Sequence, residues 1–128
     1  TSGRALLELG DVDGAANRAY YAMFDASRAA LLASGAPVDQ DLGRTHSGLI
    51  GMFGSHLVKN GRVSKDMGRL LNRAHEIRQV ADYTGESVEP AEAKDLVGQA
   101  EAFVATMRAQ FLPNRSGDDE KDGVSLTR

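Results

Sequence analysis

Three side chains that could hold a phosphate or move a proton follow one another in the sequence: His75, Arg78 and Asp82. Spacings of three and four residues place them on neighbouring turns of one helix face. Arg78 cannot lose its proton, so beside an apolar stripe it must find an acceptor or stay solvated in a cleft. His75 can act as an acid or a base near neutral pH. The same spacing also fits an ordinary Arg78–Asp82 ion pair without function.

A second set of candidates precedes these residues in the chain. His46 lies in a Thr-His-Ser-Gly stretch, and Asn17 and Tyr21 recur at helical spacing beside an apolar stripe. His46 and His75 each either form structural hydrogen bonds across a bundle or have a catalytic or phosphate-contacting role. Tyr20 lies on the apolar stripe and is expected to pack with its hydroxyl bonded, whereas Tyr21 and Asn17 could line a polar groove.

Several classes of chemistry are excluded or disfavoured by the residue types. The chain has no cysteine, which removes disulfides, iron–sulfur clusters and thiol catalysis. It has no Glu-x-x-His pair for a di-iron site and no second His four residues after His75 for a zinc protease. No glycine-rich phosphate loop and no nucleophile elbow occur either. We therefore expect no metal and no cofactor.

Charge is distributed unevenly along the 128 residues. The net charge is −3, which argues against a protein that coats nucleic acid through bulk charge. Residues 62–78 nevertheless carry five basic and two acidic side chains. Lys65, Arg69 and Arg73 are expected on the opposite side of their helix from Arg78. Only this segment offers a phosphate backbone a local excess of cations.

Apolar periodicity and capping residues predict helices nearly throughout and no strands. A short helix over about residues 2–10 ends at Gly10, and Asp11 caps a second over about 12–34. A third is expected over about 45–60, a fourth capped by Ser64 to about Tyr83, and a fifth from Pro90 to about 112. A polar loop is expected from Gly35 to about residue 44.

Three glycines are unusual for the interior of a helix. Gly48, Gly51 and Gly54 fall on related turns, and each costs about 1 kcal/mol of helix propensity relative to alanine. We expect the close approach of a neighbouring helix to require them, with contact between a ligand and the backbone as the alternative.

Helices joined by short loops can bury their stripes only against one another, which predicts an all-α, antiparallel bundle of four to five helices. The bundle is expected over residues 1–112, followed by a disordered polar tail over 113–128. Its small core favours a homodimer. No apolar run is long enough to span a membrane, so a cytoplasmic protein without membrane contact is expected.

Three strings in order carry a family resemblance: AANRAYYAMFDASRAALLASG, THSGLIGMFGSHLVKNGRVS and GRLLNRAHEIRQVADYTGE, the last followed by AEAFV in the final helix. Together they resemble a HEPN domain over about residues 5–112. The resemblance implies a helical bundle that commonly dimerises. It also implies metal-independent endoribonuclease activity in many members, often as a toxin paired with a minimal nucleotidyltransferase antitoxin.

The resemblance fits Arg78 but not the rest of the family's ribonuclease signature, in which four to six residues separate an Arg from a following His. In that signature the Arg steadies the phosphate while the His moves a proton. Here the positions for His hold Tyr83, Thr84 and Gly85, preceded by Asp82. The pattern Arg-x-x-x-Asp-Tyr is similar to a poorly characterised branch of the superfamily. Catalytic roles for Arg78, Asp82 and His75, and RNA cleavage itself, remain open.

The resemblance further implies that a tyrosine near the signature can be adenylylated by the partner, which makes Tyr83 the candidate acceptor. The leading hypothesis is a HEPN-like domain that binds a nucleotide or RNA phosphate through Arg78, with His46, Asn17 and Tyr21 as further contacts. It would be one half of a toxin–antitoxin-type pair with a nucleotidyltransferase. The alternative is a non-catalytic dimerisation or protein-interaction bundle.

Overall fold

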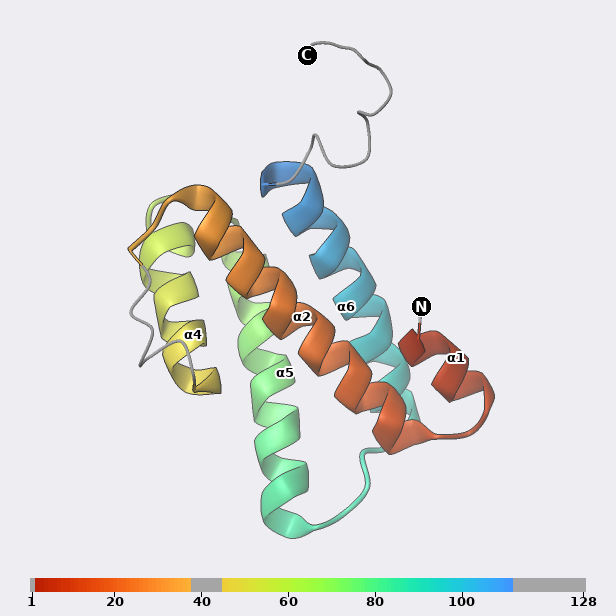
Figure 1. Cartoon of the computed structure of the whole chain (residues 1–128). Coiled ribbons are helices and arrows are strands. Elements are labelled where there is room, and N and C mark those ends of the chain that lie inside the picture. The colour runs from red at the N-terminus through yellow and green to blue at the C-terminus, as the bar shows by residue number, and fades with distance from the viewer. Residues whose placement is uncertain (1, 38–44, 112–128) are drawn as a thin grey trace, which may run out of the picture.

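The computed structural model describes residues 2–37 and 45–111, and these residues form an all-α bundle (Figure 1). The predicted fold class is thereby confirmed. The elements are α1 (Ser2–Glu8), α2 (Val12–Ser34), α4 (His46–Phe53), the π-helix η1 (Gly54–Val58), α5 (Lys65–Thr84) and α6 (Pro90–Phe111). The predicted tail and most of the predicted polar loop lie outside the described residues.

The helix ends follow the capping residues in the sequence. The Asp11 carboxylate accepts a hydrogen bond from the Gly14 N–H at 2.9 Å, and the Ser64 hydroxyl accepts one from the Met67 N–H at 3.3 Å. Gly10 has a φ of 83° and Gly85 a φ of 72°, the left-handed conformation that glycine adopts at low cost. Both predicted N-caps, and the left-handed turn expected after the first helix, are therefore confirmed.

Helix directions place the end of α5 beside the start of α2. α5 runs antiparallel to α2, α4 and α6, whereas α2 and α6 run in the same direction and pack extensively on each other (Figure 1). α1 covers one end of this pair, where Arg4 forms a 2.6 Å ion pair with Glu101 of α6. The consequence for function is that residues 75–82 of α5 face residues 13–24 of α2.

The core is continuous across these helices. The predicted stripe of α2 is fully inside, from Ala16 through Tyr20 to Leu31, and so are Phe103 and Met107 of α6. In α5, Leu71 and Ala74 are buried, whereas Leu70, Ile77 and Ala81 are only half-buried. The other helices cover only one side of α5, so the polar residues on its remaining sides lie near the surface. None of the helices in the described ranges combines the length and apolarity needed to cross a bilayer.

A helix is found over residues 46–58, close to the expected 45–60, but it is not uniformly α-helical, and the role expected for Gly51 and Gly54 was wrong. The expectation for Gly48 stays a prediction. The α-helix gives way at Gly54 to a π-helix, in which the Lys59 N–H donates to the Gly54 carbonyl at 2.9 Å. A Cβ added at Gly51 or Gly54 would meet no atom within 4 Å, so neither glycine permits a close approach. The close approach lies instead at Gly68 of α5, where a Cβ would be 3.1 Å from Cγ2 of Val58.

Asp13 connects the start of α2 to the turn that precedes α6. Its Oδ1 accepts a hydrogen bond from the Val88 N–H and its Oδ2 one from the Ser87 hydroxyl, both at 2.9 Å. These two bonds, in that order, lower the pKa of Asp13, with a smaller contribution from the positive charge of Arg78. The carboxylate therefore fixes the turn between α5 and α6 close to the end of α5 that carries Arg78.

We predict that Gly51→Ala stabilises the protein by about 1 kcal/mol, because the helix gains propensity and the new methyl group meets nothing. Gly68→Ala is the matched control, since the same gain is opposed by contact with Val58. Urea denaturation of the two variants measures the difference. Equal stabilisation by both would contradict the packing described for Gly68.

We also predict that Asp13→Asn lowers the thermal unfolding midpoint at neutral pH. The pKa of Asp13 is lowered in the folded state, so its stabilisation is present above the unfolded-state pKa of about 3.8 and is lost as pH falls through the folded-state value. The difference between wild type and variant should shrink on acidification below about pH 4. A difference that persists unchanged at low pH would show that the charge is not responsible.

Candidate functional site

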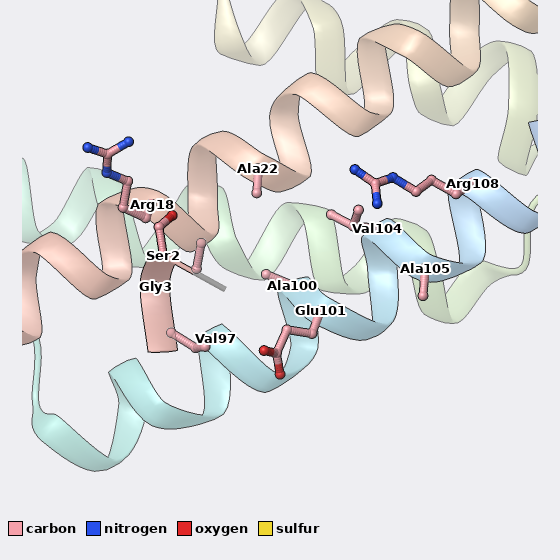
Figure 2. Close-up of a pocket in the computed structure, with 11 residues that line it drawn as sticks. Ser2, Gly3, Arg18, Ala22, Val97, Ala100, Glu101, Val104, Ala105 and Arg108 are labelled. Carbon is pink, nitrogen blue, oxygen red and sulfur yellow. The ribbon is translucent and has the colours of Figure 1, made fainter. Parts of the chain in front are cut away.

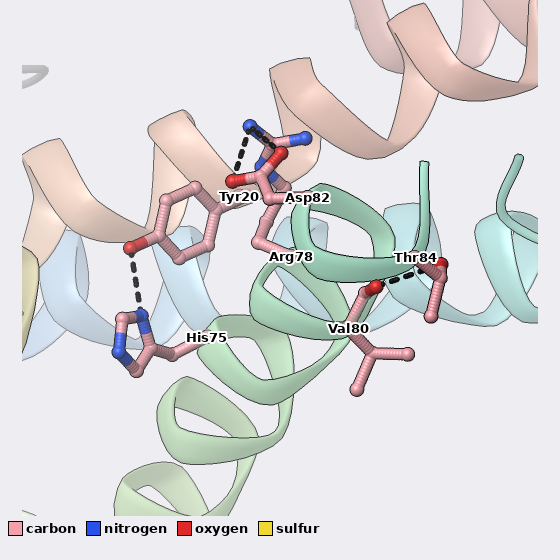
Figure 3. A network of polar contacts seen from close by, with 6 residues as sticks. All are labelled: Tyr20, His75, Arg78, Val80, Asp82 and Thr84. Atoms are coloured by element: carbon pink, nitrogen blue, oxygen red, sulfur yellow. Dashed lines mark hydrogen bonds and ion pairs between the residues drawn. The ribbon is translucent and has the colours of Figure 1, made fainter. Parts of the chain in front are cut away.

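Tyr20 is the central residue of the contact between α2 and α5. Its side chain is fully buried, and its hydroxyl shares a 3.2 Å hydrogen bond with Nδ1 of His75 (Figure 3). Burial, followed by the neighbouring phenol of Tyr21, raises the pKa of Tyr20 to about 12. Tyr20 is therefore a neutral phenol at physiological pH, and the expectation that it packs with its hydroxyl bonded is confirmed.

His46, at the start of α4, completes a cluster of rings around Tyr20. Its ring lies edge-on to Phe24 at 4.4 Å and to Tyr20 at 5.1 Å between centroids, and its centroid is 6.4 Å from that of His75. Burial, followed by the proximity of His46, lowers the pKa of His75. His75 is accordingly neutral at pH 7. We call Tyr20, Phe24, His46 and His75 the ring cluster.

Arg78 lies one turn further along α5. Its Nη2 is 3.2 Å from Oδ1 and 3.4 Å from Oδ2 of Asp82, so a single nitrogen contacts both carboxylate oxygens. The Arg78 side chain is 23% exposed and that of Asp82 is 67% exposed. This is the helical ion pair expected from the spacing, and an exposed pair of this kind contributes only about 0.3–0.5 kcal/mol.

The guanidinium of Arg78 has further hydrogen-bonding capacity. Among the residues that the structure describes, no acceptor is bonded to its Nε or Nη1, and neither nitrogen is buried away from solvent. The positive charge of Arg78 acts on both Tyr20 and Asp13. It contributes to the lowered pKa of Asp13, and it offsets part of the rise in the pKa of Tyr20. Arg78 is thus a mostly covered cation with unused donors, which suits an anion with several oxygens.

The remaining α2 candidates flank this region. Tyr21 is 44% exposed, and its ring lies edge-on to His46 at 5.7 Å. Asn17, one turn earlier, has a buried Oδ1 that receives no hydrogen bond from any described residue. An unpaired acceptor of this kind can be satisfied by a hydroxyl or amine of a ligand, or by water. The binding roles predicted for Tyr21 and Asn17 remain predictions.

Tyr83 occupies the position where the family signature would have a histidine. It is 92% exposed, near the end of α5 and beside Asp82, which is also exposed. Val80, one turn earlier, is also exposed. The hydroxyl of Tyr83 is therefore accessible to a modifying enzyme, and the side chain does not enter the protein.

The three residues singled out on α5 divide into two groups. Figure 3 shows the ring of Tyr20 between His75 on one side and the Arg78–Asp82 pair on the other. His75 is thus part of the ring cluster. Arg78 pairs with Asp82 instead, and its positive charge interacts with the Asp13 carboxylate. Sequence spacing placed all three on one face correctly, but it could not show that a side chain from α2 separates them.

Sequence reasoning also missed Asp13. Its only signal was an acidic residue in the first turn of α2, where the helix dipole favours a negative charge. Its bonds to residues 87 and 88 span more than 70 positions in sequence, so local patterns could not reveal them.

A separate groove of about 330 Å³ lies between α1, α2 and α6 (Figure 2). Its walls are mostly small or apolar residues such as Gly3, Ala22 and Ala100, with Arg18 and Arg108 at its two ends. It contains none of the predicted site residues. Among the described residues, no three histidine, aspartate or glutamate side chains converge to hold a metal ion.

Comparison with known proteins agrees with the helical arrangement. The HEPN domain family matches residues 1–110. A "UPF0332 protein" of Thermotoga maritima is 39% identical over 103 residues, which cover 79% of this chain and 74% of that protein. A protein of Methanocaldococcus jannaschii named "Putative toxin" is 34% identical over 87 residues, 68% of this chain and 61% of its own length. No solved structure matches.

A relative from Gloeobacter violaceus, also named "UPF0332 protein", is 35% identical over 94 residues, 72% of this chain and 71% of that protein. The family match covers every described helix except the last residue of α6, and it includes α5 with Arg78 and α2 with Tyr20. The chain belongs to the HEPN family.

Proposed function

We propose that this protein is a toxin-like HEPN domain that binds the phosphate of an RNA or a nucleotide through Arg78. The observation that carries this proposal is the mostly covered guanidinium of Arg78. One of its nitrogens contacts an exposed carboxylate, and no described residue accepts a hydrogen bond from the other two. A phosphate can displace Asp82 and occupy two guanidinium nitrogens at once. Two relatives from Methanocaldococcus jannaschii carry the name "Putative toxin", which supports the wider role.

The charges around Arg78 determine which ligands this site can bind. Asp82 and Asp13 both lie in its field, so the local charge is not strongly positive. A ligand therefore needs contacts beyond the phosphate, and the half-exposed ring of Tyr21 offers a surface on which a base can stack. His46 and Asn17 are the further polar groups proposed to contact it.

The proposed partners follow from the same family role. The protein is proposed to form a homodimer and to act in the cytoplasm beside a minimal nucleotidyltransferase antitoxin. The exposed Tyr83 is the proposed point of modification, because its phenol is accessible and lies one residue after Asp82. In this reaction the phenol oxygen attacks the α-phosphorus of ATP, pyrophosphate leaves, and the phenol proton passes to a base of the transferase.

A second candidate function is a non-catalytic interaction module. The exposed Val80 and Tyr83, together with the groove between α1, α2 and α6, favour it, because apolar surface of this kind suits contact with another protein. Under this interpretation Arg78 serves only to pair with Asp82. Ligand binding distinguishes the two functions.

We predict that Arg78→Ala weakens binding of a short single-stranded RNA or of ATP by about ten-fold or more, since a charged hydrogen bond contributes about 1.5–3 kcal/mol. Arg73→Ala is the matched control, because it removes the same charge from an exposed position of α5. Calorimetric titration measures both variants. Equal losses would indicate general charge attraction, and equal retention would favour the interaction module.

We predict that a minimal nucleotidyltransferase of the proposed antitoxin class transfers an adenylyl group from ATP to Tyr83. Intact mass and peptide mapping would place the added group, and Tyr83→Phe should abolish it because the nucleophilic oxygen is gone. Tyr21→Phe, which removes the other exposed phenol, should leave the modification intact. Modification at a different residue, or none, would contradict the assignment of Tyr83.

A further inference from the structure

The orientation of the hydrogen bond between Tyr20 and His75 determines what His75 can offer to a ligand. Among the described residues, the hydroxyl of Tyr20 has no hydrogen-bond partner other than Nδ1 of His75. A phenol hydroxyl can donate one hydrogen bond, and Tyr20 is completely shielded from solvent. The proton of this hydroxyl is therefore satisfied only if Nδ1 accepts it.

The reverse orientation leaves a buried donor unpaired. If Nδ1 carried the proton and donated to the phenol oxygen, the hydroxyl proton of Tyr20 would point into a packed interior without an acceptor, which costs more than one hydrogen bond returns. A doubly protonated His75 meets the same obstacle. The lowered pKa of His75, caused first by burial and then by His46, acts in the same direction.

We infer that Tyr20 fixes His75 as the tautomer with its proton on Nε2, so that His75 presents a hydrogen-bond donor rather than a base to a bound ligand. Figure 3 shows Nε2 on the side of the imidazole ring away from Tyr20. Among the described residues no acceptor is bonded to Nε2, and the side chain is only partly buried. The atom is thus free to donate.

The chemistry of this atom defines its ligand. A neutral imidazole with its proton on Nε2 and Nδ1 occupied can donate one hydrogen bond but has no free lone pair to accept a proton. It suits a phosphate or carbonyl oxygen, and it cannot activate the 2′-hydroxyl of an RNA as a general base. The identity of the ligand rests on the proposed function, whereas the tautomer does not. Tyr20 is a positioning residue that acts through His75.

The tautomer can be measured on the free protein. Long-range ¹H–¹⁵N correlation spectra of the full chain labelled with ¹⁵N-histidine, recorded near pH 8, about 1.5 units above the ordinary histidine pKa, distinguish protonated from bare ring nitrogens. Replacing His46, His56 and His75 one at a time assigns the signals. We expect His75 in a single form, with Nδ1 bare and Nε2 protonated. A proton on Nδ1, or exchange between two forms, would overturn the inference.

The tyrosine variants test the cause. In Tyr20→Phe, His75 should lose its single form and show the proton distributed between both nitrogens. Tyr21→Phe is the matched control, because it removes the neighbouring hydroxyl, which is not bonded to His75. An unchanged His75 spectrum in Tyr20→Phe would overturn the positioning role. If that variant does not fold, the wild-type spectrum alone still decides the tautomer.

Ligand binding tests the donor role. The side-chain amide of glutamine places an N–H close to the position of Nε2–H but cannot take up a proton, so His75→Gln should bind the RNA or ATP within about two-fold of wild type. His75→Ala should bind about ten-fold more weakly. Equal losses in both variants would overturn the donor role. If the wild-type protein binds neither ligand, the proposed function and the donor role both fail, while the spectra still decide the tautomer.

Discussion

The buried phenol of Tyr20 is the constraint on which the arrangement of the site depends. A neutral hydroxyl inside a packed interior must be bonded, and α5 supplies the acceptor at Nδ1 of His75. This bond fixes the position of α5 against α2 at the level of His75. The Asp13 carboxylate fixes the following turn to α2 a short distance away. Between these two attachments lies Arg78, whose backbone has little freedom to move away from α2.

Electrostatics near Arg78 follow from this arrangement. The cation faces Asp82 on its own helix and Asp13 on the neighbouring one, and it stands beside a phenol that does not ionise. The pairing with Asp82 is loose and solvent-exposed, so removing it costs little. Asp13 is different, because its oxygens are already engaged by Val88 and Ser87. An incoming anion therefore competes with one carboxylate rather than two.

The sequence predicted the helices well but not the contacts that create the site. Asp11, Ser64 and Pro90 act through neighbouring residues in the chain, so local rules located the helix starts. The close packing expected at Gly51 and Gly54 was wrong, because glycine marks both close packing and a weakened α-helix, and here it accompanies a π-turn. The bond from Tyr20 to His75 spans 55 positions and depends on how α2 crosses α5, which no periodicity encodes.

The departure from the ribonuclease signature has a structural counterpart. The signature requires a proton-transferring histidine beside the arginine, and here the residues after Arg78 are an exposed carboxylate and an exposed phenol. In Figure 3 the ring of Tyr20 lies between His75 and Arg78, and the hydroxyl of Tyr20 is bonded to Nδ1 of His75. Asp82 could accept a proton, but it is already paired with the cation that would hold the phosphate. The phosphate binding proposed for Arg78 does not depend on such a histidine.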